Sequence, residues 1–291
     1  MEDIINTLIN GFSLGGVYAL IALGYTMVYG IAKMLNFAHG DIIMVGGYAI
    51  YVFLGVTGHP VAAAAFAAVM CVLLGVVMEK LAYKPLRGAS PLAVLITAIG
   101  VSYLLQSLSQ IIFGSDPKTV IVADLGVTKI GGVSISNSSI LTLIFTVVIM
   151  AALTLFIKFS RTGRAMLAVS EDRAAAQLMG VNVNGIITVT FVIGAFLAAV
   201  ASLFYLLKYP IISNTMGSMP GIKAFTAAVI GGIGSIPGAM LGGLLLGIIE
   251  CIFNAFPAVA PYTDAIEFAI LIALLLVRPN GILGKKRREK V

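Results

Sequence analysis

The stretch Ile140-Leu-Thr-Leu-Ile-Phe-Thr-Val-Val-Ile-Met-Ala-Ala-Leu-Thr-Leu-Phe-Ile157 contains no charged residue. The hydrocarbon core of a bilayer is about 30 Å thick, and a helix needs about 20 residues to cross it. A segment in lipid must satisfy its own backbone hydrogen bonds, and the alternation typical of a barrel strand is absent here. The stretch therefore predicts a membrane-spanning helix.

Apolar runs of this kind recur along the whole chain. Besides residues 140–157, the expected spans are 4–30, 42–56, 61–78, 92–113, 186–207, 237–256 and 264–277, with a shorter apolar piece at 222–233. The sequence thus predicts an all-α fold, a polytopic integral membrane helix bundle with about eight or nine membrane segments. We expect a single transmembrane domain over residues 1–291.

Composition supports this class of protein. Hydrophobic residues make up 60% of the chain and charged residues 10%, whereas a soluble domain carries about 25% charged residues. The net charge of +6 comes from basic residues clustered in short segments between apolar runs, which argues against a nucleic-acid partner. The two cysteines lie inside apolar runs and do not have metal-ligand spacing.

Placement of the basic residues predicts the orientation in the membrane, because Lys and Arg are enriched in cytoplasmic segments. We take the C-terminus, with its basic tail 278–291, as cytoplasmic and count the short apolar piece as a crossing. On that basis 14 of the 18 Lys and Arg residues fall on the inner side. The pattern predicts an outside N-terminus and an odd number of crossings.

The short apolar piece, residues 222–233, has too few residues to cross a bilayer alone. It is followed by Gly234-Ser-Ile-Pro-Gly238, in which Gly234 and Pro237 are candidate helix-break residues. This pattern predicts a discontinuous or re-entrant segment buried within the protein. Gly11 and Gly15, and likewise Gly243 and Gly247, stand four residues apart, which predicts close helix packing.

A polar segment at residues 159–183 separates two expected spans and predicts a short surface helix. Ser170 suits the N-cap, Glu171 and Asp172 suit the positive end of the helix dipole, and Gly180 suits the end of the helix. We expect about nine residues, or about 13 Å. From the residues alone, a helix that merely connects two spans remains the simpler interpretation.

Polar residues in or near the spans form a second group of candidates. Asn36, His39 and Asp41 could make a small pathway site, but Asp41 also suits an N-cap, so a helix junction is the favoured alternative. Glu250 and Glu267 lie in or near apolar spans. No basic residue lies within a helical turn of Glu250, so it is either a functional acid or a group close to the outer surface or bonded to another helix.

Residues 171–180, Glu-Asp-Arg-Ala-Ala-Ala-Gln-Leu-Met-Gly, resemble the coupling loop of ABC importer permeases. In that family an acidic residue, a pair of alanines and a following glycine mark a short helix that docks on the ATPase subunit. Glu171, Asp172, Ala175, Ala176 and Gly180 match in kind. The hydrophobic tail of the broader motif is not clearly present.

Further segments resemble branched-chain amino acid permeases of the LivH type, and together they cover nearly the whole chain: residues 18–30, 36–41, 223–239 and 278–284. The resemblance implies a permease of the bacterial inner membrane that imports branched-chain amino acids. It also implies two ABC ATPase subunits, a second related permease in a heterodimer, and a periplasmic substrate-binding protein. Urea, short amides or another small polar solute are the alternative cargoes.

The chain lacks the Gly-x-x-x-x-Gly-Lys-Ser/Thr phosphate loop and any arrangement typical of a catalytic nucleophile. We therefore expect no enzymatic activity, cofactor or metal in this chain, with ATP hydrolysis on separate subunits. A secondary transporter driven by an ion gradient is the rival function, and Glu250 would be its carboxylate.

Overall fold

The computed structural model describes residues 2–130 and 133–284 of the 291-residue chain. The helices are α1 Glu2–Ala32, α2 His39–Thr57, α3 Pro60–Met78, α4 Pro91–Phe113, α5 Asn137–Phe159, α6 Arg161–Glu171, α7 Arg173–Leu178, α8 Val183–Lys208, α9 Ser218–Gly231, α10 Ile236–Asn254 and α11 Thr263–Val277. A π-helical turn, Glu79–Tyr83, and a 3₁₀ turn, Lys84–Leu86, continue α3.

Eight of these helices, within the described residues, are long and apolar enough to cross a membrane. They correspond to the eight full spans expected from the sequence, and the predicted polytopic helix bundle is confirmed. The short apolar piece corresponds to α9, whose 14 residues extend about 21 Å. Because that is less than the thickness of a hydrocarbon core, α9 is the discontinuous segment of the bundle.

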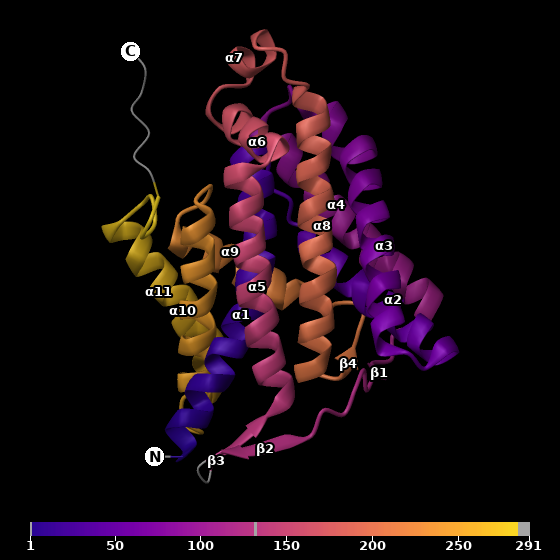
Figure 1. The fold of residues 1–291 in the computed structure, drawn as a ribbon, viewed down its shortest axis with the longest axis vertical. Coiled ribbons are helices and arrows are strands. Elements are labelled where there is room, and N and C mark those ends of the chain that lie inside the picture. The colour runs from indigo at the N-terminus through magenta and orange to yellow at the C-terminus, as the bar shows by residue number, and fades with distance from the viewer. Residues whose placement is uncertain (1, 131–132, 285–291) are drawn as a thin grey trace.

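Helix α1 forms the centre of the bundle and contacts α5, α8, α9 and α10 (Figure 1). In its most apolar stretch of 18 residues, 94% are buried, whereas the corresponding values are 22% for α4 and 11% for α11. The peripheral helices therefore expose apolar side chains, as expected of surfaces that face lipid.

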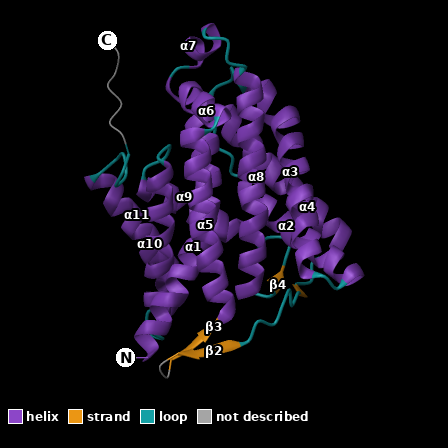
Figure 2. Cartoon of the chain, in the orientation of Figure 1, coloured by secondary structure: helices purple, strands orange, loops and turns teal. Residues whose placement is uncertain are grey.

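The two ends of the bundle differ in structure. Helices α6 and α7 project at one end, called here the α7 end, while the strands lie at the opposite end, called the hairpin end (Figures 1 and 2). There β2 Val127–Ile130 and β3 Val133–Ser136 form an antiparallel hairpin. Strand β1 Lys118–Thr119 pairs with β4 Ile211–Ile212. The sequence did not lead us to expect these short strands.

Glycines bring α1 and α10 into backbone contact. A Cβ atom added to Gly247 would lie 2.1 Å from the backbone nitrogen of Gly15, and one added to Gly243 would lie 2.4 Å from that of Ala19. These distances are far shorter than any real contact. The close packing predicted from the four-residue glycine spacing is confirmed, and only glycine fits at these positions.

The chain breaks between α9 and α10. Gly232 and Gly234 adopt positive φ angles of 107° and 92°, which glycine tolerates at little cost. The Ser235 side chain then caps α10 by accepting a hydrogen bond from the Gly238 N–H, and Pro237 occupies its first turn.

A C-terminal strap, residues 278–284, closes over this break. The N–H groups of Ile282 and Leu283 donate to the carbonyls of Ile230 and Gly231, at 2.9 and 3.0 Å. The last carbonyls of a helix have no partner within the helix. The strap therefore completes the hydrogen bonding of α9.

Candidate functional site

The polar segment at the α7 end folds as two helices instead of one. Asp172, with φ −151°, ends α6, and its side chain accepts a hydrogen bond from the Ala175 N–H at 3.0 Å to cap α7. The expectation that Ser170 caps a helix of about nine residues is wrong. Ser170 stays inside α6 because its hydroxyl donates back to the Leu167 carbonyl, and the carboxylate two residues later takes the cap.

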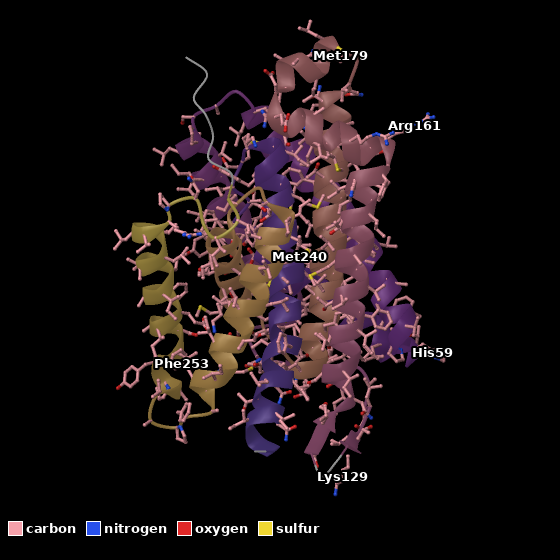
Figure 3. All side chains as sticks on the ribbon, turned by 60° about the vertical axis from the view of Figure 1, so that its left-hand side comes forward. His59, Lys129, Arg161, Met179, Met240 and Phe253 are labelled. Atoms are coloured by element: carbon pink, nitrogen blue, oxygen red, sulfur yellow. The ribbon has the colours of Figure 1, made fainter. Side chains whose placement is uncertain are left out.

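Helix α7 has six residues and ends in an exposed apolar tip. Gly180 adopts φ +83°, and the Val181 N–H donates to the Ala176 carbonyl, so the chain turns back sharply. The side chains just before this turn are left outside: Leu178 is 89% exposed and Met179 is 84% exposed. Figure 3 places Met179 at the extreme of the α7 end. Apolar side chains at a projecting tip are typical of an interaction surface.

The other candidate residues of this segment are distributed over its two helices. Glu171 is the exposed last residue of α6, and Ala175 is exposed on α7. Ala176 is buried and faces the bundle. Of the five residues selected from the sequence, Asp172 thus caps α7, Ala176 is buried and Gly180 forms the C-terminal turn. The other two, Glu171 and Ala175, are exposed.

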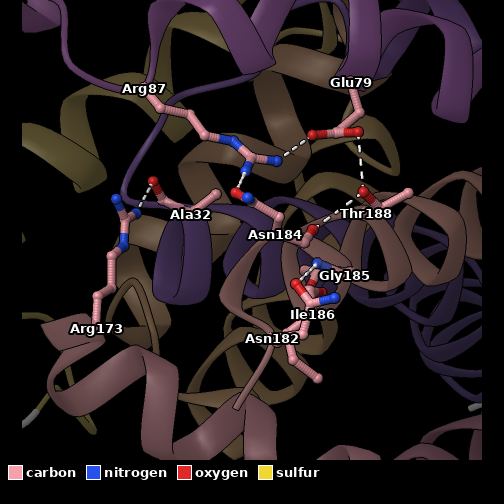
Figure 4. A network of polar contacts seen from close by, with 10 residues as sticks. Ala32, Glu79, Arg87, Arg173, Asn182, Asn184, Gly185, Ile186 and Thr188 are labelled. Carbon is pink, nitrogen blue, oxygen red and sulfur yellow. Dashed lines mark hydrogen bonds and ion pairs between the residues drawn. The ribbon is translucent and has the colours of Figure 1, made fainter. Parts of the chain in front are cut away.

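Arg173 connects α7 to the central helix of the bundle. Its guanidinium donates to the carbonyls of Ile31, at 3.2 Å, and Ala32, the last residues of α1 (Figure 4). Burial and the nearby charge of Arg87 lower the pKa of Arg173, although an arginine remains protonated at physiological pH. A positive charge at a helix C-terminus stabilises the helix dipole, so the contact also favours the end of α1.

A second polar network lies at the same end (Figure 4). Arg87 forms an ion pair with Glu79 of the π-helical turn and donates to the side chain of Asn184. The Thr188 hydroxyl donates to the other oxygen of Glu79 at 3.0 Å. This network joins the end of α3 to the start of α8. No local pattern in the sequence indicates this network, because the residues after α3 and those at the start of α8 lie about 100 positions apart.

Asn36 and Asp41 are buried, but they bond to different helices. The Tyr83 hydroxyl donates to Asn36 at 2.6 Å, and the Gln106 amide donates to Asp41 at 2.9 Å. Asp41 lies in the first turn of α2, whose N-cap is Ala38, so the expected capping role of Asp41 is wrong. The two side chains join α2 and the chain before it to α3 and α4.

His39 is also fully buried and packs against α1. Its ring makes an edge contact with Tyr25, with centroids 4.8 Å apart. A Cβ on Gly24 would lie 2.3 Å from the His39 ring, so this glycine makes room for the imidazole. Asn36, His39 and Asp41 therefore make three separate contacts, and their part in a substrate pathway stays a prediction.

Glu250 lies in a buried cluster of charges. Lys223 of α9 approaches Glu250 at 3.0 Å, Asp264 at 2.7 Å and Glu267 at 3.4 Å. The Tyr18 hydroxyl of α1 donates to the other Glu250 oxygen at 2.8 Å. The sequence singles out the two glutamates but places Lys223 among the outer segments, because a partner 27 residues away leaves no local pattern.

Comparison with known proteins agrees with this architecture. Residues 7–275 match the model of the family described as branched-chain amino acid transport system / permease component. The chain is 47% identical to the high-affinity branched-chain amino acid transport system permease protein BraD of Pseudomonas aeruginosa, over 98% of this chain and 97% of that protein.

Further relatives carry the name LivH. The high-affinity branched-chain amino acid transport system permease protein LivH of Escherichia coli is 45% identical, over 97% of this chain and 96% of that protein. The probable LivH permease of Methanocaldococcus jannaschii is 30% identical, over 91% of this chain and 88% of that protein. The chain therefore belongs to the branched-chain amino acid transport system permease family.

Proposed function

We propose that this chain is the membrane-spanning permease subunit of an ATP-driven importer of branched-chain amino acids in a bacterial inner membrane. Its partners would be two ABC ATPase subunits, a second related permease and a periplasmic substrate-binding protein. The proposal rests on near full-length similarity to permeases that are named for this transport.

Residues 159–183 are the proposed ATPase-coupling segment, and the observation that carries this proposal is the exposed tip of α7. Leu178 and Met179 offer apolar side chains to a partner, while Asp172 and Gly180 fix the two ends of the short helix. A force on the tip passes through Arg173 to the end of α1, the most buried span. Movement of an ATPase dimer would thus reach the central helix, and alternating access would follow as one part of the bundle rocks against the other.

Basic residues support a cytoplasmic α7 end and C-terminus. Arg161, Arg164 and Arg173 belong to the α6–α7 segment, and Lys80 and Arg87 follow α3 at the same end. Figure 3 places Arg161 near Met179 and Lys129 at the opposite end. Lys and Arg are enriched on the cytoplasmic side of membrane proteins. The hairpin end would then receive substrate from the binding protein.

The rival ion-driven mechanism would need an available carboxylate at Glu250. Both Glu250 oxygens are engaged, one by Lys223 and the other by Tyr18. This pairing favours the ATP-driven proposal.

The coupling proposal is tested by placing a charge on the α7 tip. We expect Leu178→Asp to lower co-purification of the ATPase subunits at least tenfold and to abolish ATP-dependent leucine uptake in proteoliposomes. The matched control is Val127→Asp, which places the same carboxylate on an exposed apolar position of β2 at the hairpin end. It should retain the ATPase subunits. Equal ATPase retention by the two variants would contradict the docking role of α7.

A further inference from the structure

The cluster around Lys223 has an excess of negative charge. One ammonium group serves three carboxylates, Glu250, Asp264 and Glu267, which gives a formal charge of −2. Among the described residues, no other cation lies within ion-pair distance of these acids. Buried charges in a membrane protein are costly unless they are compensated.

The acids of the cluster differ in how fully their negative charges are paired with donors and cations. Glu250 is satisfied, because one oxygen faces Lys223 and the other accepts from Tyr18. Glu267 is not: its side chain is 0% exposed, neither oxygen accepts a hydrogen bond, and its nearest cation, Lys223, lies at 3.4 Å. A carboxylate has room for about four hydrogen bonds. Glu267 therefore has unused acceptor capacity inside the protein.

Asp264 lies beside Glu267 and opens the cluster to the outside. The two residues are three positions apart on α11 and so share one helix face. Asp264 is 50% exposed, whereas the rest of the cluster is buried. Two neighbouring carboxylates repel each other, and Lys223, which pairs with both and also with Glu250, offsets only part of that repulsion.

The cluster lies close to the hairpin end of the bundle. Glu250 is one turn before the end of α10, and Glu267 is one turn after the start of α11. Helix α11 is also the least buried of the spans. In the proposed orientation this is the side on which substrate arrives.

We propose that Glu267 and Asp264 bind the α-ammonium group of the amino acid when it enters at the hairpin end, with Lys223 and Glu250 holding the two acids in place. A primary ammonium carries one positive charge and three N–H donors, which suits the free oxygens of two carboxylates. The acids of the described chain are not grouped so as to hold a metal ion. This inference rests on the proposed function, which supplies the class of substrate.

The test measures ligand binding to the assembled transporter in lipid nanodiscs by saturation-transfer NMR, without the binding protein. Leucinamide retains the ammonium and lacks the carboxylate, while 4-methylpentanoate retains the carboxylate and lacks the ammonium. At about pH 6.5, where the amine is protonated, we expect leucinamide to displace leucine and 4-methylpentanoate not to do so.

Variants locate the ammonium contact. Glu267→Gln keeps the shape of the side chain and should weaken leucine binding at least tenfold, and Asp264→Asn should weaken it severalfold. The control Asp116→Asn changes an exposed aspartate in the loop between α4 and β1 and should leave binding unchanged. Size-exclusion chromatography shows whether each variant is folded, and if Glu267→Gln is not, the half-exposed Asp264→Asn decides.

Three results would overturn the inference. They are displacement of leucine by 4-methylpentanoate as effectively as by leucinamide, unchanged leucine binding by folded Glu267→Gln, and competition by sodium ions that disappears in that variant. The last would assign the site to an inorganic cation. Leucine uptake by the wild-type transporter with its binding protein tests the proposed function separately, because it can succeed while the ammonium site fails.

Discussion

Helix α10 packs against its neighbours through two different interfaces, called here the glycine seam and the charged seam. In the glycine seam, Gly243 and Gly247 bring the backbone of α10 so close to the backbone of α1 that a Cβ atom does not fit. In the charged seam, which joins α10 to α9 and α11, Lys223 of α9 is shared among one acid of α10 and two acids of α11. Lipid is as apolar as leucine, so burial of apolar surface does not hold helices together in a membrane. Close backbone contact fixes one arrangement of α1 and α10, whereas the charged groups of the charged seam can exchange ion-pair partners.

The largest effect is expected from breaking the glycine seam. Gly247→Val would place three carbon atoms where the backbone of Gly15 lies, so α1 and α10 would have to separate. We expect no folded, monodisperse protein on size-exclusion chromatography.

The control for this prediction is Gly100→Ala in α4, where an added Cβ meets no atom within 4 Å. It should be neutral or should stabilise the protein by up to about 1 kcal/mol, because alanine favours helix more than glycine does. A well-folded Gly247→Val protein would show that the seam is looser than its geometry indicates.

An intermediate effect is expected from breaking the charged seam. Lys223→Met leaves three buried or half-buried acids without their cation, which should cost about 3–5 kcal/mol of stability. The matched control is Lys208→Met, since Lys208 donates to the Asn10 carbonyl and forms no ion pair in the described part of the chain. Thermal unfolding in detergent should rank the two variants in this order, and the reverse order would refute the role assigned to Lys223.

The smallest effect is expected where the two seams meet. Tyr18→Phe removes the hydroxyl that α1 donates to Glu250, and a hydrogen bond to a charged group contributes about 1.5–3 kcal/mol. Tyr48→Phe is the comparison, because the Tyr48 hydroxyl is buried without a partner in the described structure. Its loss should be neutral or stabilising. Similar thermal stabilities for the two variants would mean that Tyr18 does not connect the seams.

The sequence was sufficient to predict the spans, because bilayer thickness requires long uncharged runs that are visible residue by residue. The short apolar piece and its Gly234–Pro237 break were visible for the same reason. The glycine seam could be anticipated from a four-residue spacing on each helix, since that spacing places small residues on one face.

The polar contacts were harder to predict, because each depends on residues that are distant in sequence. Lys223 looks like an ordinary loop charge until the fold brings α10 and α11 beside it. Ser170 and Asp172 are both good caps, and a local hydrogen bond to Leu167 decides between them. Asn36, His39 and Asp41 are close in sequence, but their side chains face three different helices.

The strap bears on the order in which parts of the chain reach their folded structure. The carbonyls at the end of α9 are bonded by residues synthesised about fifty positions later, after both α10 and α11 have been made. During insertion, α9 is therefore a short helix that packs against α1, while its last carbonyls still lack the hydrogen bonds that the strap supplies. The re-entrant part of the bundle reaches its final form only when residues 282 and 283 have returned to it.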